Sequence, residues 1–471
     1  MPEGCLVGID IGSTRTKALV VDLEGRALSD GYTETPWTPT SSGAEAAPED
    51  LYEAALSATR SALDAAPEGP VIGVGVTGMA EALALLDKSG RSVAPAIAWY
   101  DERGEQEEAE LGRQFGAERF TALTGLPVST TASIIKIRWI RRHLPDALAA
   151  RRALSIPDYV AYRLGGVPSA ELSLASRTGL FDVSKMRWAD ELLRWADLPE
   201  DLFPTALAAG SLLGRVADPP AGLPRLRGAA IAVGGQDHQC AAAGVGIVST
   251  REVLNSCGTA EAYVRSTAPL GPTDLVAAVA TGVGVGCHVV PRCQAILAGR
   301  PYGLVLGPVF DLLDWNDSLE TRAGEAAVGV AGTGVHIGGT SGAGAGRQLD
   351  IGLSFSFDEA TGRSCFSGIG LGVSARQAKA LAIEEVLRRS FYLYAAVEKL
   401  GGPVERVAMT GGWARAEPLM AAKVERFPGA HLVSLREPGA RGAALFAGCA
   451  AELFSGPEAF PAPPPDPRAA G

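Results

Sequence analysis

A short segment in the first half of the chain recurs in the second half, and this repeat constrains the fold more than any other feature. Residues 71–78 read VIGVGVTG and residues 404–411 read VERVAMTG, so both have valine at the first and fourth places and end in Thr-Gly. A looser pair accompanies them, because Gly12 and Gly258 each lie in a turn between two strand-like runs. Two echoes in the same order indicate a duplicated fold rather than two unrelated domains.

Hydrophobic patterning predicts that strands alternate with helices in both halves. A helix is expected from Pro48 to about Ala65, because proline suits a first helical turn and apolar residues then repeat at helical spacing. Another is expected from about Ala375 to Leu400, where a Gly-Gly-Pro sequence ends it. Short apolar runs predict strands at 6–11, 18–22, 71–76 and 404–409. This alternation is typical of an α/β fold.

The length of 471 residues suggests two large domains. We place the boundary after the Ala/Gly-rich run 241–244, which gives domains of 1–247 and 248–455. The tail 456–471 is rich in Pro and Ala and lacks an apolar pattern, so we expect it to be disordered. Residues 324–346 are dense in Gly and Ala, and the sequence leaves open whether they form a mobile loop or a close-packed pair of strands.

Charge and cysteine content argue against several kinds of partner. The formal charge is −11, and an acidic surface repels nucleic acid and anionic membranes. No run of about 20 apolar residues is present to span a membrane, and the start of the chain does not read as a signal peptide. Seven scattered cysteines without a CxxC indicate neither a disulfide framework nor a zinc ribbon. We expect a reduced, cytoplasmic protein whose oligomeric state stays open, a homodimer included.

Familiar nucleotide-binding motifs are absent or misplaced. The chain has no GxxxxGK[ST] sequence, which excludes a P-loop. A GxGxxG does occur at Gly73, Gly75 and Gly78, but its first two glycines lie inside a predicted strand. The dinucleotide mechanism needs these glycines in the turn after the strand, so we interpret the match as chance.

Asp10 ends an apolar strand and directly precedes a polar turn at Gly12, Ser13 and Thr14. A carboxylate there can hold Mg²⁺ directly or through water. The turn can offer backbone N–H groups to phosphate oxygens, and Lys17 adds a positive charge nearby. The alternative is a plain β-hairpin with a polar turn.

A second candidate is the run Gly234-Gly235-Gln236-Asp237-His238. Glycines let the backbone approach a ligand, and Asp237 and His238 would then be offered at a strand end. A carboxylate beside a sugar hydroxyl can take its proton as the oxygen attacks phosphorus. The alternative is a turn with a capping aspartate.

The third candidate, Trp99 to Arg103, combines an aromatic surface with Asp101 and a guanidinium. Sugars suit such sites, because their C–H faces pack on aromatic rings while charged groups hydrogen-bond their hydroxyls. The alternative is a solvated helix start, since a charged run continues from Glu105 to Glu110.

Taken together and in this order, these segments resemble the FGGY carbohydrate kinases, a branch of the actin, Hsp70 and hexokinase superfamily. The resemblance covers residues 6 to 452. The segments that carry it are 8–14 with Lys17, 75–79, 96–103, 158–164, 175–178, 234–237, 256–259, 410–413 and 442–444. It implies two duplicated ribonuclease-H-like domains with a hinged cleft and an ATP-dependent sugar kinase activity.

The resemblance also implies roles for individual residues. Asp237 inherits the role of catalytic base, and Asp10 that of the Mg²⁺ ligand. The substrate-binding residues it implies are Glu81, Trp99, Asp101, Arg103, Asp237 and His238. The residues expected to bind ATP are Gly12, Ser13, Thr14, Lys17, Gly258, Thr259, Gly411, Gly412 and Trp413.

Two departures from the family pattern leave the substrate open. Position 80 is Ala, where glycerol kinases of the family usually have Arg and xylulokinases His. Trp413 is bulkier than the small residue often found there, and would stack on adenine or crowd it. We expect a small sugar, polyol or sugar acid of five or six carbons as substrate. The alternatives are a catalytically idle regulator that binds sugar or nucleotide, and an actin- or Hsp70-like ATPase that moves a partner.

Overall fold

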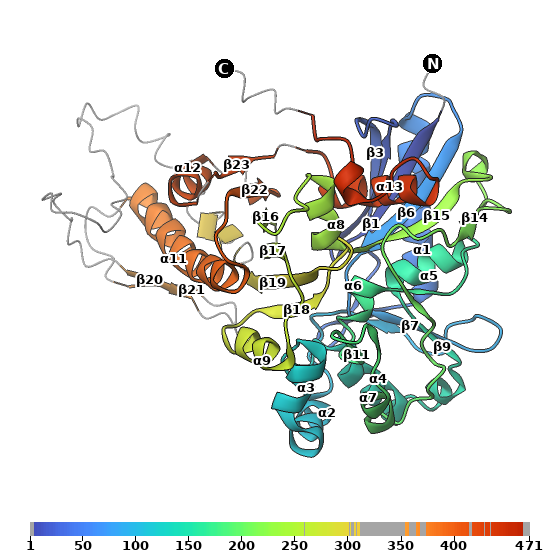
Figure 1. Ribbon diagram of the computed structural model, residues 1–471, viewed down its shortest axis with the longest axis horizontal. Coiled ribbons are helices and arrows are strands. Elements are labelled where there is room, and N and C mark those ends of the chain that lie inside the picture. The colour runs from blue at the N-terminus through green and yellow to red at the C-terminus, as the bar shows by residue number, and fades with distance from the viewer. Residues whose placement is uncertain are drawn as a thin grey trace, which may run out of the picture.

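The computed structural model describes residues 4–258, 260–300, 302, 306–307, 309–310, 354–357, 364–367, 374–413, 417–427, 429–433 and 435–464. Thr259 and the Gly-rich segment 324–346 lie outside these residues. The described chain folds around two six-stranded sheets with helices packed on them (Figure 1). This arrangement confirms the predicted α/β class.

The first sheet has the strand order β14-β15-β6-β1-β2-β3. Its central strand β1 pairs antiparallel with β2 and parallel with β6. Asp10 stands opposite Lys17 on β2 and opposite Thr77 on β6. The strands are β1 (Cys5–Ile11), β2 (Arg15–Val21), β3 (Ala27–Glu34), β6 (Val71–Gly78), β14 (Gly214–Arg215) and β15 (Ala230–Gln236).

The second sheet has the order β18-β19-β17-β16-β22-β23. Here β16 pairs antiparallel with β17 and parallel with β22, as β1 does with β2 and β6. The repeat 71–78 coincides with β6 and β22 lies within the repeat 404–411, so the structure carries the duplication that the sequence indicates. The strands are β16 (Glu252–Cys257), β17 (Glu261–Thr267), β18 (Gly284–Cys287), β19 (Gln294–Arg300), β22 (Arg406–Thr410) and β23 (His431–Leu432).

The helix that covers each sheet also follows the repeat. α1 (Pro48–Ala65) packs on β2 and β3, and α11 (Ala375–Gly401) packs on β17 and β19. Both helices lie close to the predicted limits. Ser374 caps α11 through a reciprocal pair of hydrogen bonds with Gln377, which fixes where the helix begins.

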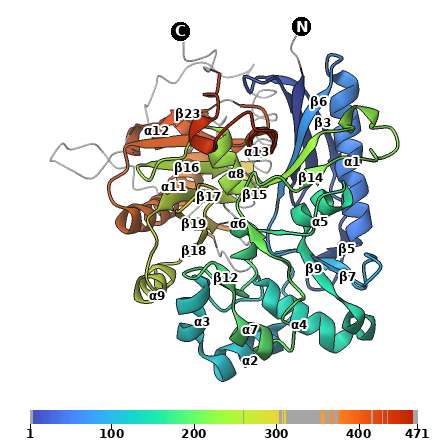
Figure 2. The same cartoon turned by 45° about the vertical axis from the view of Figure 1, so that its right-hand side comes forward.

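Two further helices cross between the sheets. α8 (Asp237–Gly244) follows β15, and α13 (Pro438–Ala450) lies on β1, β6 and β15 of the first sheet (Figure 2). The backbone of α13 lies very close to the first sheet. A Cβ added to Gly8 would lie 1.8 Å from a carbonyl oxygen of α13, and one added to Gly75 would lie 1.9 Å from another. Packing against a helix therefore accounts for the glycines inside β6, in agreement with their interpretation as a chance nucleotide motif.

The remaining elements form the lower part of the molecule and its edges. The helices are α2 (Glu105–Glu110), α3 (Ala117–Thr124), α4 (Ser133–His143), α5 (Ile156–Arg163), α6 (Leu172–Ala175), α7 (Asp190–Trp195), α9 (Pro272–Ala280) and α12 (Glu417–Arg426). Single helical turns of other types lie at Leu111–Gly116, Pro145–Ala149, Pro224–Leu226 and Pro457–Ala459. The short strands are β4 (Thr38–Pro39), β5 (Ala44–Ala46), β7 (Leu83–Leu86), β8 (Ala96–Ile97), β9 (Arg152–Ser155), β10 (Ala170–Glu171), β11 (Phe181–Asp182), β12 (Arg187–Trp188), β13 (Ala206–Leu207), β20 (Ser354–Phe357) and β21 (Ser364–Ser367).

The tail differs from the prediction of disorder over 456–471. Within the described part, Phe460 packs edge-on against Phe446 and Phe454, with ring centroids 5.1 and 5.7 Å away. The buried Arg441 donates from Nη2 to the carbonyl of Pro461 at 2.9 Å. One aromatic ring and the carbonyls of Pro461 and Ala462 hold this segment, which is too little to give a periodic pattern. Residues 465–471 lie outside the described residues. In the part of the chain that is described, no helix is long and apolar enough to cross a membrane.

Candidate active site

Asp10 is a half-buried residue, and one oxygen of its carboxylate is buried and unsatisfied. It lies near the end of β1, and its Oδ1 has no hydrogen-bond partner among the described residues. Burial raises the pKa of Asp10 to about 6; Asp237 and Glu437 also raise it, while Lys17 and His238 lower it. The charges of these four residues therefore act on Asp10.

The surroundings of Asp10 fit a metal that takes most of its ligands from elsewhere. The described residues contain no group of three His, Cys, Asp or Glu side chains that could hold a metal ion. Mg²⁺ keeps several waters and is bound in phosphate-handling sites through one or two carboxylates plus the substrate phosphates. A single buried carboxylate with a free oxygen matches that mode.

Asp237 begins α8 and presents one carboxylate oxygen to its surroundings. Gln236 caps the helix by accepting from the backbone of Gln239 at 3.2 Å. Oδ1 of Asp237 accepts from the Gln236 side-chain amide and, at 2.7 Å, from the backbone N–H of His238. No described residue donates to Oδ2. The cap therefore orients the carboxylate and leaves one oxygen open as a proton acceptor.

Lys17, which the sequence predicts as a positive charge near the phosphate turn, is paired with a glutamate from the other end of the chain. Its Nζ lies 2.6 Å from Oε2 of Glu437, the residue that precedes α13 and has a left-handed φ of 41°. Burial lowers the pKa of Lys17, but Asp10 and Glu437 outweigh burial and raise it. A Cβ on Gly439 would lie 2.6 Å from Oδ2 of Asp10, so the first turn of α13 closes over this carboxylate.

The turn after β1 is connected to the aromatic loop. The carbonyl of Gly12 accepts from Thr35 at 2.7 Å, and Ser13 accepts from the indole N–H of Trp99 at 2.8 Å. Thr14 is exposed at the tip of the turn. The predicted phosphate turn and the predicted sugar platform are therefore neighbours.

Trp99 is held by a buried lysine that the sequence analysis does not single out. Nζ of Lys136 donates to the carbonyls of Ala98 and Trp99 at 2.6 and 2.7 Å. Burial lowers the pKa of Lys136 to about 8, although Glu81 and Asp101 act in the opposite direction. Trp99 remains 36% exposed, so the clamp presents this residue to solvent. A lysine in an amphipathic helix gives no sequence signal for this role.

Asp101 and Arg103 are occupied with each other. Arg103 bonds both oxygens of Asp101 at 2.8 Å and Glu45 at 2.7 Å, while Thr40 and Ser42 also donate to Asp101. Burial raises the pKa of Asp101, but these donors hold it at about 2. This closed network fixes the loop after β8 and offers a substrate little free hydrogen-bonding capacity. The alternative interpretation, a helix start at residues 99–103, does not hold, because α2 begins at Glu105.

Glu81 lies in a strained turn and pairs with a residue far away in the sequence. Its φ is 61°, and Ala82 donates to the carbonyl of Ala80 at 2.7 Å, which makes a γ-turn of the rare strained kind. Nε of Arg177 donates to Oε1 of Glu81 at 2.8 Å. Backbone strain of this kind concentrates at functional sites. Arg177 belongs to the family-like segment 175–178, in which the sequence predicts no role for it.

The segment around α6 links Arg177 to the start of α8. The hydroxyl of Ser173 accepts from the backbone N–H of Gln236 at 2.9 Å and donates to Glu171 at 2.5 Å. Burial raises the pKa of Glu171 to about 7. Glu171 thus supports the turn that presents Asp237, and the sequence analysis misses it.

In the second half, the described glycines form an open corner. Gly411 has a φ of 99°, and a Cβ there would lie 2.4 Å from the carbonyl of Cys257. Gly412 has no neighbour within 4 Å of such an atom, and Gly258 turns back to bond Ala260 at 3.1 Å. Trp413 meets Phe310 edge-on at 5.3 Å, so its ring already has an aromatic partner.

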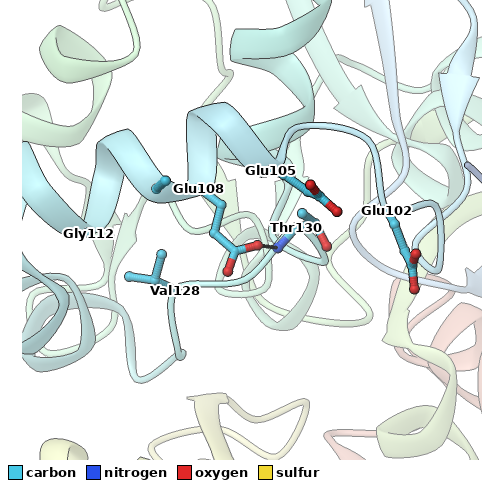
Figure 3. A pocket seen from close by; sticks show the side chains of 7 residues that line it. Glu102, Glu105, Glu108, Gly112, Val128 and Thr130 are labelled. Atoms are coloured by element: carbon cyan, nitrogen blue, oxygen red, sulfur yellow. Dashed lines mark hydrogen bonds between the residues drawn. The ribbon is translucent and has the colours of Figure 1, made fainter. Parts of the chain in front are cut away.

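A cavity of about 620 Å³ lies beside α2 and does not contain the predicted site residues. Figure 3 shows the carboxylates of Glu102, Glu105 and Glu108 around it, with Glu108 accepting from the backbone of Thr130 at 2.9 Å. Its lining is acidic and comes from one helix and the adjoining loops. We therefore identify the candidate site with the Asp10–Asp237 region rather than with this cavity.

The sequence matches a family model described as the N-terminal domain of the FGGY family of carbohydrate kinases, over residues 5–244. A curated xylulose kinase of Streptomyces rubiginosus is 33% identical over 65% of this chain and 64% of its own. A glycerol kinase of Chloroflexus aggregans is 30% identical over 55% of this chain and 54% of its own. The matches thus span less than two thirds of these relatives.

Solved structures resemble the whole described fold. A kinase from Brucella ovis, described as a "xyloylose kinase", superposes with a TM-score of 0.77 over 98% of this chain and 93% of its own, at 22% identity. A glycerol kinase of Plasmodium falciparum with ADP gives 0.78 over 98% and 93%, at 16% identity. At such identities the likeness concerns the fold.

Proposed function

Since the chain belongs to the FGGY family of carbohydrate kinases, we propose that it transfers the terminal phosphoryl group of ATP to a hydroxyl of a small sugar, polyol or sugar acid of five or six carbons. One observation carries the proposal: Oδ2 of Asp237 and Oδ1 of Asp10 both lack a partner among the described residues, and the charge of Asp237 acts on Asp10. A proton acceptor and a metal ligand that interact in this way suit phosphoryl transfer.

The acceptor hydroxyl binds next to Asp237 in this proposal. Oδ2 takes the hydroxyl proton as the substrate oxygen attacks phosphorus, while the two donors on Oδ1 keep the carboxylate oriented. Trp99 provides an apolar face for the sugar, with Glu81 and His238 at its hydroxyls. Asp101 and Arg103 act by fixing the Trp99 loop, because their own hydrogen bonds are already used.

The nucleotide binds mainly to the second half, which we propose as the nucleotide domain, 248–455, beside a sugar domain of 1–247. Gly411 and Gly412 lie near the adenosine, Gly258 and Thr259 near the phosphates, and Gly12 to Thr14 meet the terminal phosphate from the first half. Lys17 leaves its ion pair with Glu437 and binds the phosphates instead. Mg²⁺, when bound at Asp10, neutralises charge on the phosphate oxygens. Closure of the two halves would exclude water.

A coupled ADP-release assay tests the proposal against D-xylulose, D-ribulose, xylitol, D-gluconate, D-glucose and glycerol. We expect sugar-dependent ADP formation, and glycerol to be a poorer substrate, because Ala80 removes a charged clamp. Such a clamp contributes about 10- to 150-fold in kcat/KM. A rate of ADP release that is the same with and without each sugar would indicate an ATPase instead. Sugar binding without any transfer would indicate a regulator. A tenfold preference for glycerol would refute our interpretation of the pocket.

A further inference from the structure

We infer that Arg177 is a substrate-binding residue that, together with Glu81, determines specificity and supplies the guanidinium that position 80 lacks. The inference rests on the proposed function and adds a residue to its sugar site. It starts from the ion pair between Nε of Arg177 and Oε1 of Glu81, at 2.8 Å.

Each partner of this pair has an unused edge. No described residue accepts from Nη1 or Nη2 of Arg177, and none donates to Oε2 of Glu81. The two side chains are only 17% and 10% exposed. None of these atoms is among the buried polar atoms of the described residues that lack a partner, so Nη1, Nη2 and Oε2 reach solvent at the open edge of the pair. They are therefore accessible to a polar ligand that takes up their hydrogen bonds.

The position of Arg177 places these edges in the proposed site. Four residues earlier in the chain, Ser173 bonds the backbone of Gln236, next to Asp237. On the opposite side, Nη1 of Arg177 would lie 3.0 Å from a Cβ on Gly284 of β18, so the guanidinium stands where the second half meets the first. One short segment thus joins Glu81 to the proposed base.

The other cations near Glu81 are already committed. Arg103 is closed off by Asp101 and Glu45, and Lys136 spends its ammonium on the carbonyls of Ala98 and Trp99. Neither can replace the missing clamp without breaking a buried network. Among the described cations close to Glu81, Arg177 is the one with hydrogen bonds left to give.

The chemistry of the pair fits a vicinal diol. Oε2 of Glu81 can accept from one hydroxyl, and the nitrogens of Arg177 can donate to both oxygens. The γ-turn fixes the carboxylate, and the carboxylate fixes the guanidinium through Nε. A substrate with two adjacent hydroxyls distant from the reacting one would satisfy both edges at once.

The test compares Arg177→Gln and Arg177→Lys with Arg187→Gln, the same change at an exposed arginine. The best substrate of the panel and its monodeoxy analogues, each lacking one hydroxyl, are assayed by steady-state kinetics and by calorimetric titration without ATP. We expect Arg177→Gln to raise KM and Kd about 10- to 150-fold with kcat little changed. Arg177→Lys should fall between, since it keeps the charge but loses the fork.

The deoxy series distinguishes binding from a structural role. The wild type should discriminate at least tenfold against the analogue that lacks the contacted hydroxyl, and Arg177→Gln should lose this discrimination while keeping its Tm. Unchanged Kd, or an equal loss for every analogue, would overturn the inference even if the kinase activity is established. A wild type that phosphorylates no sugar but binds one still allows the titration to decide on Arg177, and one that binds none overturns both proposals.

Discussion

Asp237 accepts two hydrogen bonds through Oδ1 and offers Oδ2 as the proposed base, and a single substitution can separate these two roles. Asp237→Asn keeps its shape and can retain the hydrogen bonds of the cap, but removes the basic oxygen. We expect kcat to fall about 10²- to 10⁴-fold, the usual contribution of a general base. Binding of ATP and sugar, measured by titration, should change little. A variant that keeps more than about a third of wild-type kcat would exclude Asp237 as the base.

The proposed role of Asp10 as a metal ligand predicts that its substitution changes the Mg²⁺ dependence of the activity. Asp10→Ala removes the carboxylate whose Oδ1 has no partner, so we expect a higher half-saturating Mg²⁺ concentration and a lower kcat. Activity titrated against Mg²⁺ measures both. Asp218→Ala, at an exposed surface position, serves as the control. A normal kcat with an unchanged Mg²⁺ curve would contradict the assignment.

For single residues of the site, the sequence predicts those at the ends of strands. It misses those whose partners lie far away in the sequence. Asp10 and Asp237 are recognisable because each lies at a strand end beside glycines. Arg177 meets Glu81 across 96 residues, and Lys136 acts on backbone carbonyls that any residue could provide. Their roles depend on tertiary contacts that leave no local pattern. The ion pair of Lys17 is missed for the same reason, because its partner Glu437 comes from the opposite end of the chain.

Among the elements, the contact between α13 and the first sheet predicts a sharp effect. A Cβ on Gly75 would lie 1.9 Å from the carbonyl of Ala443, and backbone cannot yield as a side chain does. We expect Gly75→Ala to destabilise the fold by about 3 kcal/mol or more, beyond ordinary overpacking. Thermal unfolding measures it. Gly112→Ala is the matched control, since nothing lies within 4 Å there, and an equal Tm for both variants would contradict the packing argument.

The α6 segment predicts a dependence of stability on pH. The folded pKa of Glu171 is about 7, above its ordinary value of 4.5, so the unfolded chain releases this proton first. Stability should therefore fall as pH rises from about 4.5 to about 7, by an amount on the order of 3 kcal/mol. Asp158 is raised in the same direction, to about 8, and adds to the effect.

Glu171→Gln cannot ionise, so the loss of stability between pH 5 and pH 8 should be smaller than in the wild type. Guanidinium unfolding at both pH values measures the difference. The comparison uses the change with pH rather than absolute stability, because the amide also alters the hydrogen bonds to Ser173. Parallel stability curves for the two proteins would show that Glu171 does not carry the shift.

Sequence periodicity predicts the long elements well. The limits of α1 and the start of α11 agree with prediction because proline at one start and a capping box at the other are local signals. The α6 helix spans only Leu172–Ala175 and offers no period to detect. The sequence leaves open whether residues 99–103 form a sugar platform or a helix start. The charges of this loop satisfy each other in a network, and α2 begins only at Glu105.

For the whole molecule, the C-terminal tail predicts a measurable contribution. Ending the chain after residue 455 removes Phe460 from Phe446 and Phe454, and removes an acceptor from Arg441. We expect a loss of about 1–3 kcal/mol in the free energy of unfolding. Ending the chain after residue 464 keeps these contacts and should behave as the wild type. Equal stability of the two truncated chains would show that residues 456–464 do not contribute to the fold, as expected for a disordered tail.

The placement of α13 also determines when the protein can fold. Residues 5–244 form one unit in sequence comparison, but the face of β1, β6 and β15 is covered by a helix that begins at Pro438. During synthesis on the ribosome, nearly all of the chain must emerge before that face is closed. Until then the bare glycine-lined surface is exposed to other nascent chains, which makes this stage prone to aggregation. Expression of the first half by itself would prolong this exposure indefinitely.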